Sequence, residues 1–160
     1  MIKCSQKLDQ LPPYIFTRIK ALAAEAHAHR LDVIDLGMGN PDLPTPPHVV
    51  DRLIDSVKNH PRTHRYPQAK GMPRYRKAVT GYMKSRFGVD LNPEENVLAL
   101  IGSKEGIAHL CQAYMDPGDY ALVPVPSYPV HSNGVILAGG QIHYMPLTPE
   151  NKFLPDYSRV

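Results

Sequence analysis

Residues 97–106 read VLALIGSKEG, and this segment decides the fold. Its first half, 97–101, is a short apolar run typical of a buried strand, and residues 107–111 continue as an apolar, helix-like run. A strand that turns through Gly-Ser into a helix leaves backbone N–H groups free in the first helical turn. With the Ser103 hydroxyl and the Lys104 ammonium, these groups suit a phosphate, and they predict that the chain binds a nucleotide or a phosphorylated cofactor.

Strand-like and helix-like segments alternate along much of the chain. Expected helices cover residues 15–29, 72–87, 104–114 and 127–137, another helix begins near Pro47, and expected strands cover 97–101, 120–125 and 141–145. Residues 1–13 read as an irregular arm that ends in two prolines. The alternation predicts an α/β layer with parallel strand pairs.

Composition and charge are those of an ordinary globular protein. The chain has 160 residues, 42% hydrophobic and 21% charged, which is enough for one domain with a real core. A net charge of +3 is too small to predict nucleic-acid binding, and no apolar run is long enough to cross a membrane. The start of the chain does not resemble a signal peptide, and the two cysteines, Cys4 and Cys111, are far apart. We therefore expect a cytoplasmic chain with reduced thiols.

Familiar motifs are absent or incomplete. Gly37 and Gly39 do not make a dinucleotide fingerprint, because the third glycine is missing and Pro41 lies where a helix should begin. A plain turn and a close approach of a ligand to the backbone both remain open there. The corner at 102–104 lacks the spacing of a Walker loop, and the histidines lack the spacing of a metal site.

Two tyrosines and a basic cluster allow two interpretations each. Tyr66 follows arginines in a polar loop, and Tyr128 follows an expected strand, so each side chain could contact a ligand or simply pack. Basic residues gather between Arg62 and Arg86. They predict either a solvated helix face or a positive rim around an anionic ligand.

The order of these pieces resembles the N-terminal part of a class I/II aminotransferase, a fold type I enzyme that depends on pyridoxal 5'-phosphate. The residues that carry the resemblance are Leu11-Pro12-Pro13-Tyr14, Ile34-Asp35-Leu36-Gly37-Met38-Gly39-Asn40-Pro41-Asp42 with Thr45-Pro46, Tyr66 with Gly71 and Arg76, Gly102-Ser103-Lys104-Glu105-Gly106, and Pro126-Ser127-Tyr128-Pro129. The sequences of residues 37–42, GMGNPD, and 102–110, GSKEGIAHL, most resemble those of the alanine-forming, LL-diaminopimelate and aspartate aminotransferase subgroup.

The resemblance implies a fold and a role for each matching residue. The fold is α/β, a partial three-layer sandwich of the fold type I major domain; residues 1–45 would be an arm and helix of the small domain, and 46–160 an incomplete large, cofactor-binding domain. Ser103 and Lys104 would hold the cofactor phosphate, and Tyr128, where many relatives carry tryptophan, would stack on the pyridine ring. Tyr66 would reach the phosphate bound to a partner subunit, which implies a homodimer. Gly39 would meet the substrate carboxylate.

The same resemblance places the catalytic groups beyond residue 160. Family members are more than twice this long, and the Schiff-base lysine, the aspartate that pairs with the pyridinium nitrogen and the arginine that binds substrate lie in the later part. We therefore expect no catalytic residue and no metal ligand here, and an N-terminal fragment that is inactive alone. The complete enzyme would move an amino group between an amino acid and a 2-oxo acid. The alternatives are a non-catalytic module that retains a phosphate half-site, a transcription regulator that borrows this domain, or a lyase on the same fold.

Overall fold

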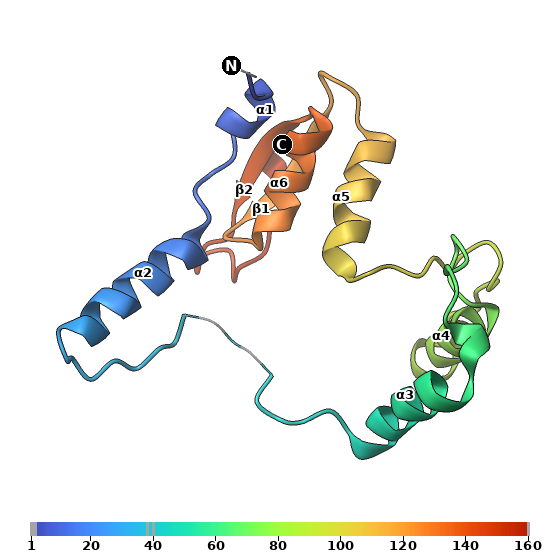
Figure 1. Ribbon diagram of the computed structural model, residues 1–160. Coiled ribbons are helices and arrows are strands. Elements are labelled where there is room, and N and C mark those ends of the chain that lie inside the picture. Colours follow the sequence, from blue (N-terminus) through green and yellow to red (C-terminus); the bar gives the residue numbers. More distant parts are fainter. Residues whose placement is uncertain (1–2, 38, 40, 160) are drawn as a thin grey trace. The chain divides into compact units, whose positions relative to one another are not determined.

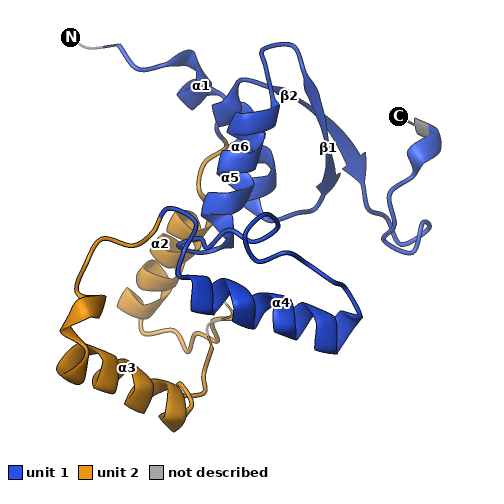
Figure 2. Ribbon diagram, turned by 90° about the vertical axis from the view of Figure 1, so that its right-hand side faces the viewer, with its two compact units in different colours: residues 1–11, 69–160 blue, residues 12–68 orange. Residues whose placement is uncertain are grey.

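The computed structural model describes residues 3–37, 39 and 41–159, and it contains both helices and a small sheet (Figure 1). The elements are α1 (Gln6–Asp9), α2 (Ile15–Ala28), α3 (Pro47–Asn59), the 3₁₀ turn η1 (Pro61–Thr63), α4 (Pro73–Phe87), α5 (Ser103–Tyr114), β1 (Tyr120–Val125), α6 (Pro129–Ala138), β2 (Gln141–Pro146) and the 3₁₀ turn η2 (Tyr157–Arg159). The chain forms two compact units, which Figure 2 colours separately: residues 1–11 with 69–160, and residues 12–68. None of the described helices is both long and apolar enough to span a membrane.

The core of the first unit is a parallel strand pair covered by α6. β1 pairs with β2 in a register that runs from Tyr120 opposite Gln141 to Val125 opposite Pro146. Helix α6 connects the two strands, as a parallel pair requires. The most deeply buried apolar side chains come from the two strands and from α6: Val123, Met145, Val135 and Ile136. The predicted parallel α/β arrangement is confirmed.

Helices α5 and α6 lie side by side, and a glycine allows their close approach (Figures 1 and 2). A Cβ atom at Gly134 would lie 3.3 Å from Cys111 Sγ and 3.5 Å from the Ala108 Cα. Because Gly134 has no side chain, the backbone of α6 packs directly against α5. The far end of α6 is held by α1, where Lys7 Nζ donates a hydrogen bond to the Leu137 carbonyl at 3.0 Å.

Two expectations about local structure are wrong. Residues 97–101 form no strand, because a strand needs a hydrogen-bonded ladder and these residues bond elsewhere. The Ala99 N–H donates to the Lys70 carbonyl at 3.1 Å, and the Ile101 N–H donates to Glu105 Oε2 at 2.6 Å. The arm at 1–13 is also not wholly irregular, since α1 forms within it, with Ser5 accepting from the Lys7 N–H at the helix start.

The second unit holds α2 and α3. An apolar hollow of about 320 Å³ lies between α2 and the segment Val33–Gly37. At the end of α3, Asp55 accepts from Asn59 Nδ2 at 2.9 Å and from Arg52 Nη1 at 2.6 Å. The Asn59 hydrogen bond, with His60 and Arg52 nearby, holds the pKa of the Asp55 carboxyl below its usual value. The apolar stripe of α3 is exposed, and it comprises Val49, Val50, Leu53, Ile54 and Val57.

Arg76, a buried residue of α4, links the segments before and after this helix through hydrogen bonds to their backbone carbonyls. Arg76 is only 3% exposed, and it is the one buried charged residue among those that the structure describes. Its Nη1 donates to the Pro93 carbonyl at 2.6 Å and to Glu94 Oε2 at 2.8 Å, and its Nε donates to the Gly71 carbonyl at 3.2 Å. The interpretation of the basic cluster as a solvated face is therefore wrong for Arg76, because the backbone carbonyls around it supply the acceptors that water would supply at a surface.

This network predicts an acid-dependent loss of stability. The hydrogen bond from Arg76 holds the pKa of Glu94 below its ordinary value, which is about 4.3 in an unfolded chain. A carboxyl group with a lowered pKa in the folded state stabilises the fold above its unfolded pKa, and this contribution is lost as pH falls through the folded pKa. We expect the urea midpoint to fall on acidification below about pH 5.

Replacement of Glu94 by glutamine should reduce that acid-dependent fall. The matched control is Glu95→Gln, because Glu95 is the exposed neighbour of Glu94 and is not among the hydrogen-bond partners of Arg76. If wild type and Glu94→Gln show the same change in urea midpoint between pH 5 and pH 3, the Arg76–Glu94 pair does not contribute as proposed.

Candidate cofactor-binding site

The corner before α5 is built around Gly102, a position that residues other than glycine fit poorly. Gly102 is the N-cap residue of α5, with φ 91° and ψ 152°, so an L-residue would be strained there. A Cβ atom at Gly102 would meet nothing within 4 Å, which means that the backbone is open to a ligand on that side. Ser103 and Lys104 are the first residues of the helix and are exposed. The first-turn N–H groups and the positive end of the helix dipole favour an anion at this position.

The corner is held from within by two contacts. Glu105 Oε2 accepts from the Ile101 N–H at 2.6 Å, which ties the incoming segment to the first turn of α5. Leu100 packs over Gly106, where an added Cβ would collide with Leu100 Cδ1. The geometry of the turn is therefore fixed by residues on both sides of it.

The Tyr128 side chain lies beside this corner. The Lys104 ammonium lies 5.0 Å from the centroid of the Tyr128 ring, within the range of a cation–π contact. Tyr128 is the N-cap residue of α6, and its side chain is 44% exposed. It follows the cis Val125–Pro126 bond at the carboxyl end of β1. The two helices α5 and α6 thus begin at one end of their pair, where parallel α/β proteins commonly bind ligands.

The structure therefore brings together three of the five residues predicted from the sequence: Ser103, Lys104 and Tyr128. A positive helix terminus, a hydroxyl, an ammonium and a half-exposed aromatic ring are suited to a ligand that joins a phosphate to a flat ring. Pyridoxal 5'-phosphate has this chemistry, and the open side of Gly102 leaves room for its phosphate. The residues present fit the cofactor, while the role of each one remains a prediction.

Gly39 and Tyr66 belong to the other compact unit. Gly39 is exposed, and a Cβ there would meet nothing within 4 Å. The turn before it is held by Asp35 Oδ1, which accepts from the Gly37 N–H at 2.8 Å. Two residues of the same motif, at positions 38 and 40, lie outside the described residues. Tyr66 is fully exposed beside an open hollow that His64, Arg65 and Pro67 also line.

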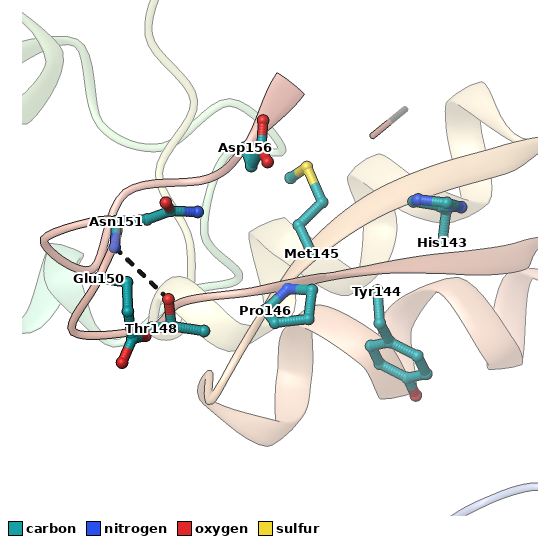
Figure 3. Close-up of a pocket in the computed structure, with 8 residues that line it drawn as sticks. All are labelled: His143, Tyr144, Met145, Pro146, Thr148, Glu150, Asn151 and Asp156. Carbon is teal, nitrogen blue, oxygen red and sulfur yellow. Dashed lines mark hydrogen bonds between the residues drawn. The ribbon is translucent and has the colours of Figure 1, made fainter. Parts of the chain in front are cut away.

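A different hollow, of about 300 Å³, lies along β2 and the turn that follows it (Figure 3). Within it the Asn151 N–H donates to Thr148 Oγ1 at 3.4 Å. A hydrogen bond from its own backbone, and one with Thr148, hold the pKa of Glu150 below its usual value. None of the residues predicted from the sequence lines this hollow. We therefore place the candidate site at the start of α5 and not here.

Sequence reasoning did not find the part played by Glu105. The signal was present, because a glutamate three residues after the N-cap has the position from which a capping-box side chain reaches back to the backbone; its partner here is the Ile101 N–H, one residue before the N-cap. The pattern was hidden by glycine at position 102, where the usual motif has serine or threonine.

The structure is an α/β protein in which the start of α5 lies open beside an aromatic ring. Comparison with known proteins gives the family. Residues 31–160 match the aminotransferase class I and II family, and the chain belongs to it. It corresponds to the N-terminal portion of a fold type I aminotransferase.

The chain is also similar to individual enzymes and structures. It is 49% identical over 156 residues to the LL-diaminopimelate aminotransferase of Moorella thermoacetica, covering 98% of this chain and 40% of that enzyme. Apo-BacF from Bacillus subtilis has a TM-score of 0.88 at 37% identity, covering 100% of this chain and 41% of that one. A single mutant of Thermus thermophilus aspartate aminotransferase has a TM-score of 0.85 at 28% identity, covering 99% and 41%. The chain thus spans about 40% of the length of the curated relatives it matches.

Proposed function

We propose that the whole protein is a pyridoxal 5'-phosphate-dependent aminotransferase that moves an amino group between an amino acid and a 2-oxo acid. The chain described above supplies the phosphate-binding and ring-stacking half of the site. The observation that carries the proposal is the Lys104 ammonium 5.0 Å from the Tyr128 ring at the open start of α5. The family of the chain supports the same reaction class.

The residues of this half-site bind and orient the cofactor. The first-turn N–H groups, the Ser103 hydroxyl and the Lys104 ammonium would neutralise and fix the phosphate, while Tyr128 would hold the flat ring by stacking. The cofactor, when bound, supplies the electron sink for amino-group transfer. Lys104 has a binding role here and not that of the Schiff-base lysine, because it belongs to the phosphate corner.

Gly39 and Tyr66 extend the proposal to substrate and partner. The open backbone at Gly39 supports a contact with the substrate carboxylate. The full exposure of Tyr66 supports a role outside its own subunit, at the phosphate bound to a partner copy in a homodimer. The first donors to test are LL-diaminopimelate and aspartate, after the enzymes that the chain resembles. Free thiols at Cys4 and Cys111 support the expected cytoplasmic location.

The phosphate corner can be tested by cofactor affinity. In the full-length protein, Ser103→Ala and Lys104→Met should each raise the Kd for pyridoxal 5'-phosphate by about 10- to 100-fold, because each removes a hydrogen-bond donor to a charged group. The Kd for pyridoxal, which lacks the phosphate, should change little. Fluorescence titration of the apoprotein measures both constants.

The matched control is Lys58→Met, an exposed lysine of α3, which should leave both constants unchanged. Equal losses of affinity for pyridoxal and for its phosphate would show that Ser103 and Lys104 do not bind the phosphate. Cofactor binding by the full-length protein without keto-acid product from any donor would contradict the proposed reaction while leaving the site intact.

A further inference from the structure

A carboxylate lies in the first turn of α5, where the proposed function places a dianion. Like charges a few ångströms apart repel each other, so Glu105 should weaken phosphate binding. Its side chain is 36% exposed, and its Oε1 lies 3.9 Å from His109 Nδ1, beyond hydrogen-bonding distance. The presence of this carboxylate therefore calls for a compensating role.

The contact with Ile101 supplies that role. Glu105 Oε2 accepts from the Ile101 N–H at 2.6 Å, and Ile101 directly precedes the N-cap residue Gly102. A carboxylate at the third helical position that reaches back to the entering backbone fixes the conformation of the turn between them. That turn contains the backbone of Gly102, Ser103 and Lys104, which would face the phosphate.

The segment that enters this turn is restrained by two hydrogen bonds. The Ala99 N–H donates to the Lys70 carbonyl at 3.1 Å, and the Ile101 N–H donates to Glu105 Oε2 at 2.6 Å. The Ile101 side chain is 95% exposed and adds little packing. Glu105 thus links the end of an extended segment to a stable helix.

We propose that Glu105 is a positioning residue, which holds the 102–104 backbone in the conformation that accepts the cofactor phosphate. The proposal rests on the proposed function. The hydrogen bond from Ile101 to Glu105 favours phosphate binding, whereas the negative charge of Glu105 opposes it. The two effects can be separated, because glutamine keeps an oxygen that can accept from Ile101 but carries no charge, whereas alanine loses both.

The test compares Glu105→Gln with Glu105→Ala in the full-length protein. We expect Glu105→Gln to bind pyridoxal 5'-phosphate about 2- to 5-fold more tightly than wild type, because a repulsion is removed. Glu105→Ala should bind it about 10-fold more weakly, because the turn loses its restraint. Affinity for pyridoxal should change little in either variant. Glu25→Gln, on an exposed position of α2, is the matched control and should behave as wild type.

A second readout does not depend on the cofactor. Amide hydrogen exchange of Ile101 in the apoprotein should be slow in wild type and Glu105→Gln and faster in Glu105→Ala. Equal exchange in all three proteins, or equal affinity in the two variants, would overturn the proposal. If wild type does not prefer the phosphorylated cofactor over pyridoxal, the proposed function fails, and the Ile101 exchange rates still decide whether Glu105 positions the turn.

Discussion

Replacing Arg76 by methionine is expected to lower the free energy of unfolding by about 2 to 4 kcal/mol, because two backbone carbonyls lose a buried donor. Methionine retains an unbranched apolar side chain but donates no hydrogen bond, so the carbonyls of Gly71 and Pro93 would lose the donors that now lie 3.2 and 2.6 Å away. An unsatisfied buried acceptor costs about 1 to 3 kcal/mol. Glu94 loses its partner too, but its side chain is 60% exposed and can be solvated by water.

Urea denaturation followed by circular dichroism measures the effect. The matched control is Arg74→Met on the same helix, whose exposed side chain should change stability by no more than about 0.5 kcal/mol. Arg76→Lys should be intermediate, because one ammonium cannot reproduce the planar array of donors. A urea midpoint of Arg76→Met that equals that of Arg74→Met would show that the buried network does not stabilise the protein.

Elements whose ends are marked by local chemistry could be predicted from the sequence. Pro47, Pro73 and Pro129 each occupy the first turn of a helix, where the missing N–H is not needed. Gly88 follows α4 in the left-handed conformation, and the expected end of this helix at residue 87 is confirmed. These signals act within one turn of the chain, so a single sequence contains them completely.

Features that depend on distant partners could not be predicted in the same way. Residues 97–101 have the composition of a strand, but whether they form one depends on a neighbouring ladder that no local pattern specifies. Arg76 lies in a basic stretch that reads as surface, and its burial depends on carbonyls at 71 and 93 that come together only in the fold. The candidate site could be predicted only in part. The order of motifs pointed to Ser103, Lys104 and Tyr128, but the contact from Glu105 to Ile101 required the actual turn at Gly102.

Gly71→Ala should destabilise the protein by about 3 kcal/mol, through two separate costs. Gly71 has φ 85°, a conformation that strains any residue with a Cβ atom. The new Cβ would also collide with the Ala99 Cβ, and it would lie 3.5 Å from the Ala99 backbone. The collision cannot be relieved by rotating a side chain. Moving the backbone instead would disturb the Ala99 N–H bond to Lys70 and the Arg76 bond to the Gly71 carbonyl.

A second substitution separates these two costs. Ala99→Gly removes the atom that the new Cβ would meet, so the Gly71→Ala/Ala99→Gly double variant should recover about 1 to 2 kcal/mol relative to the sum of the single variants. The remaining loss is the strain of a positive φ, which Ala99→Gly cannot relieve. Urea titration of the four proteins gives the coupling free energy directly. Strict additivity would mean that Gly71 and Ala99 are not in contact in solution, and that the segment leading into α5 is held by other residues.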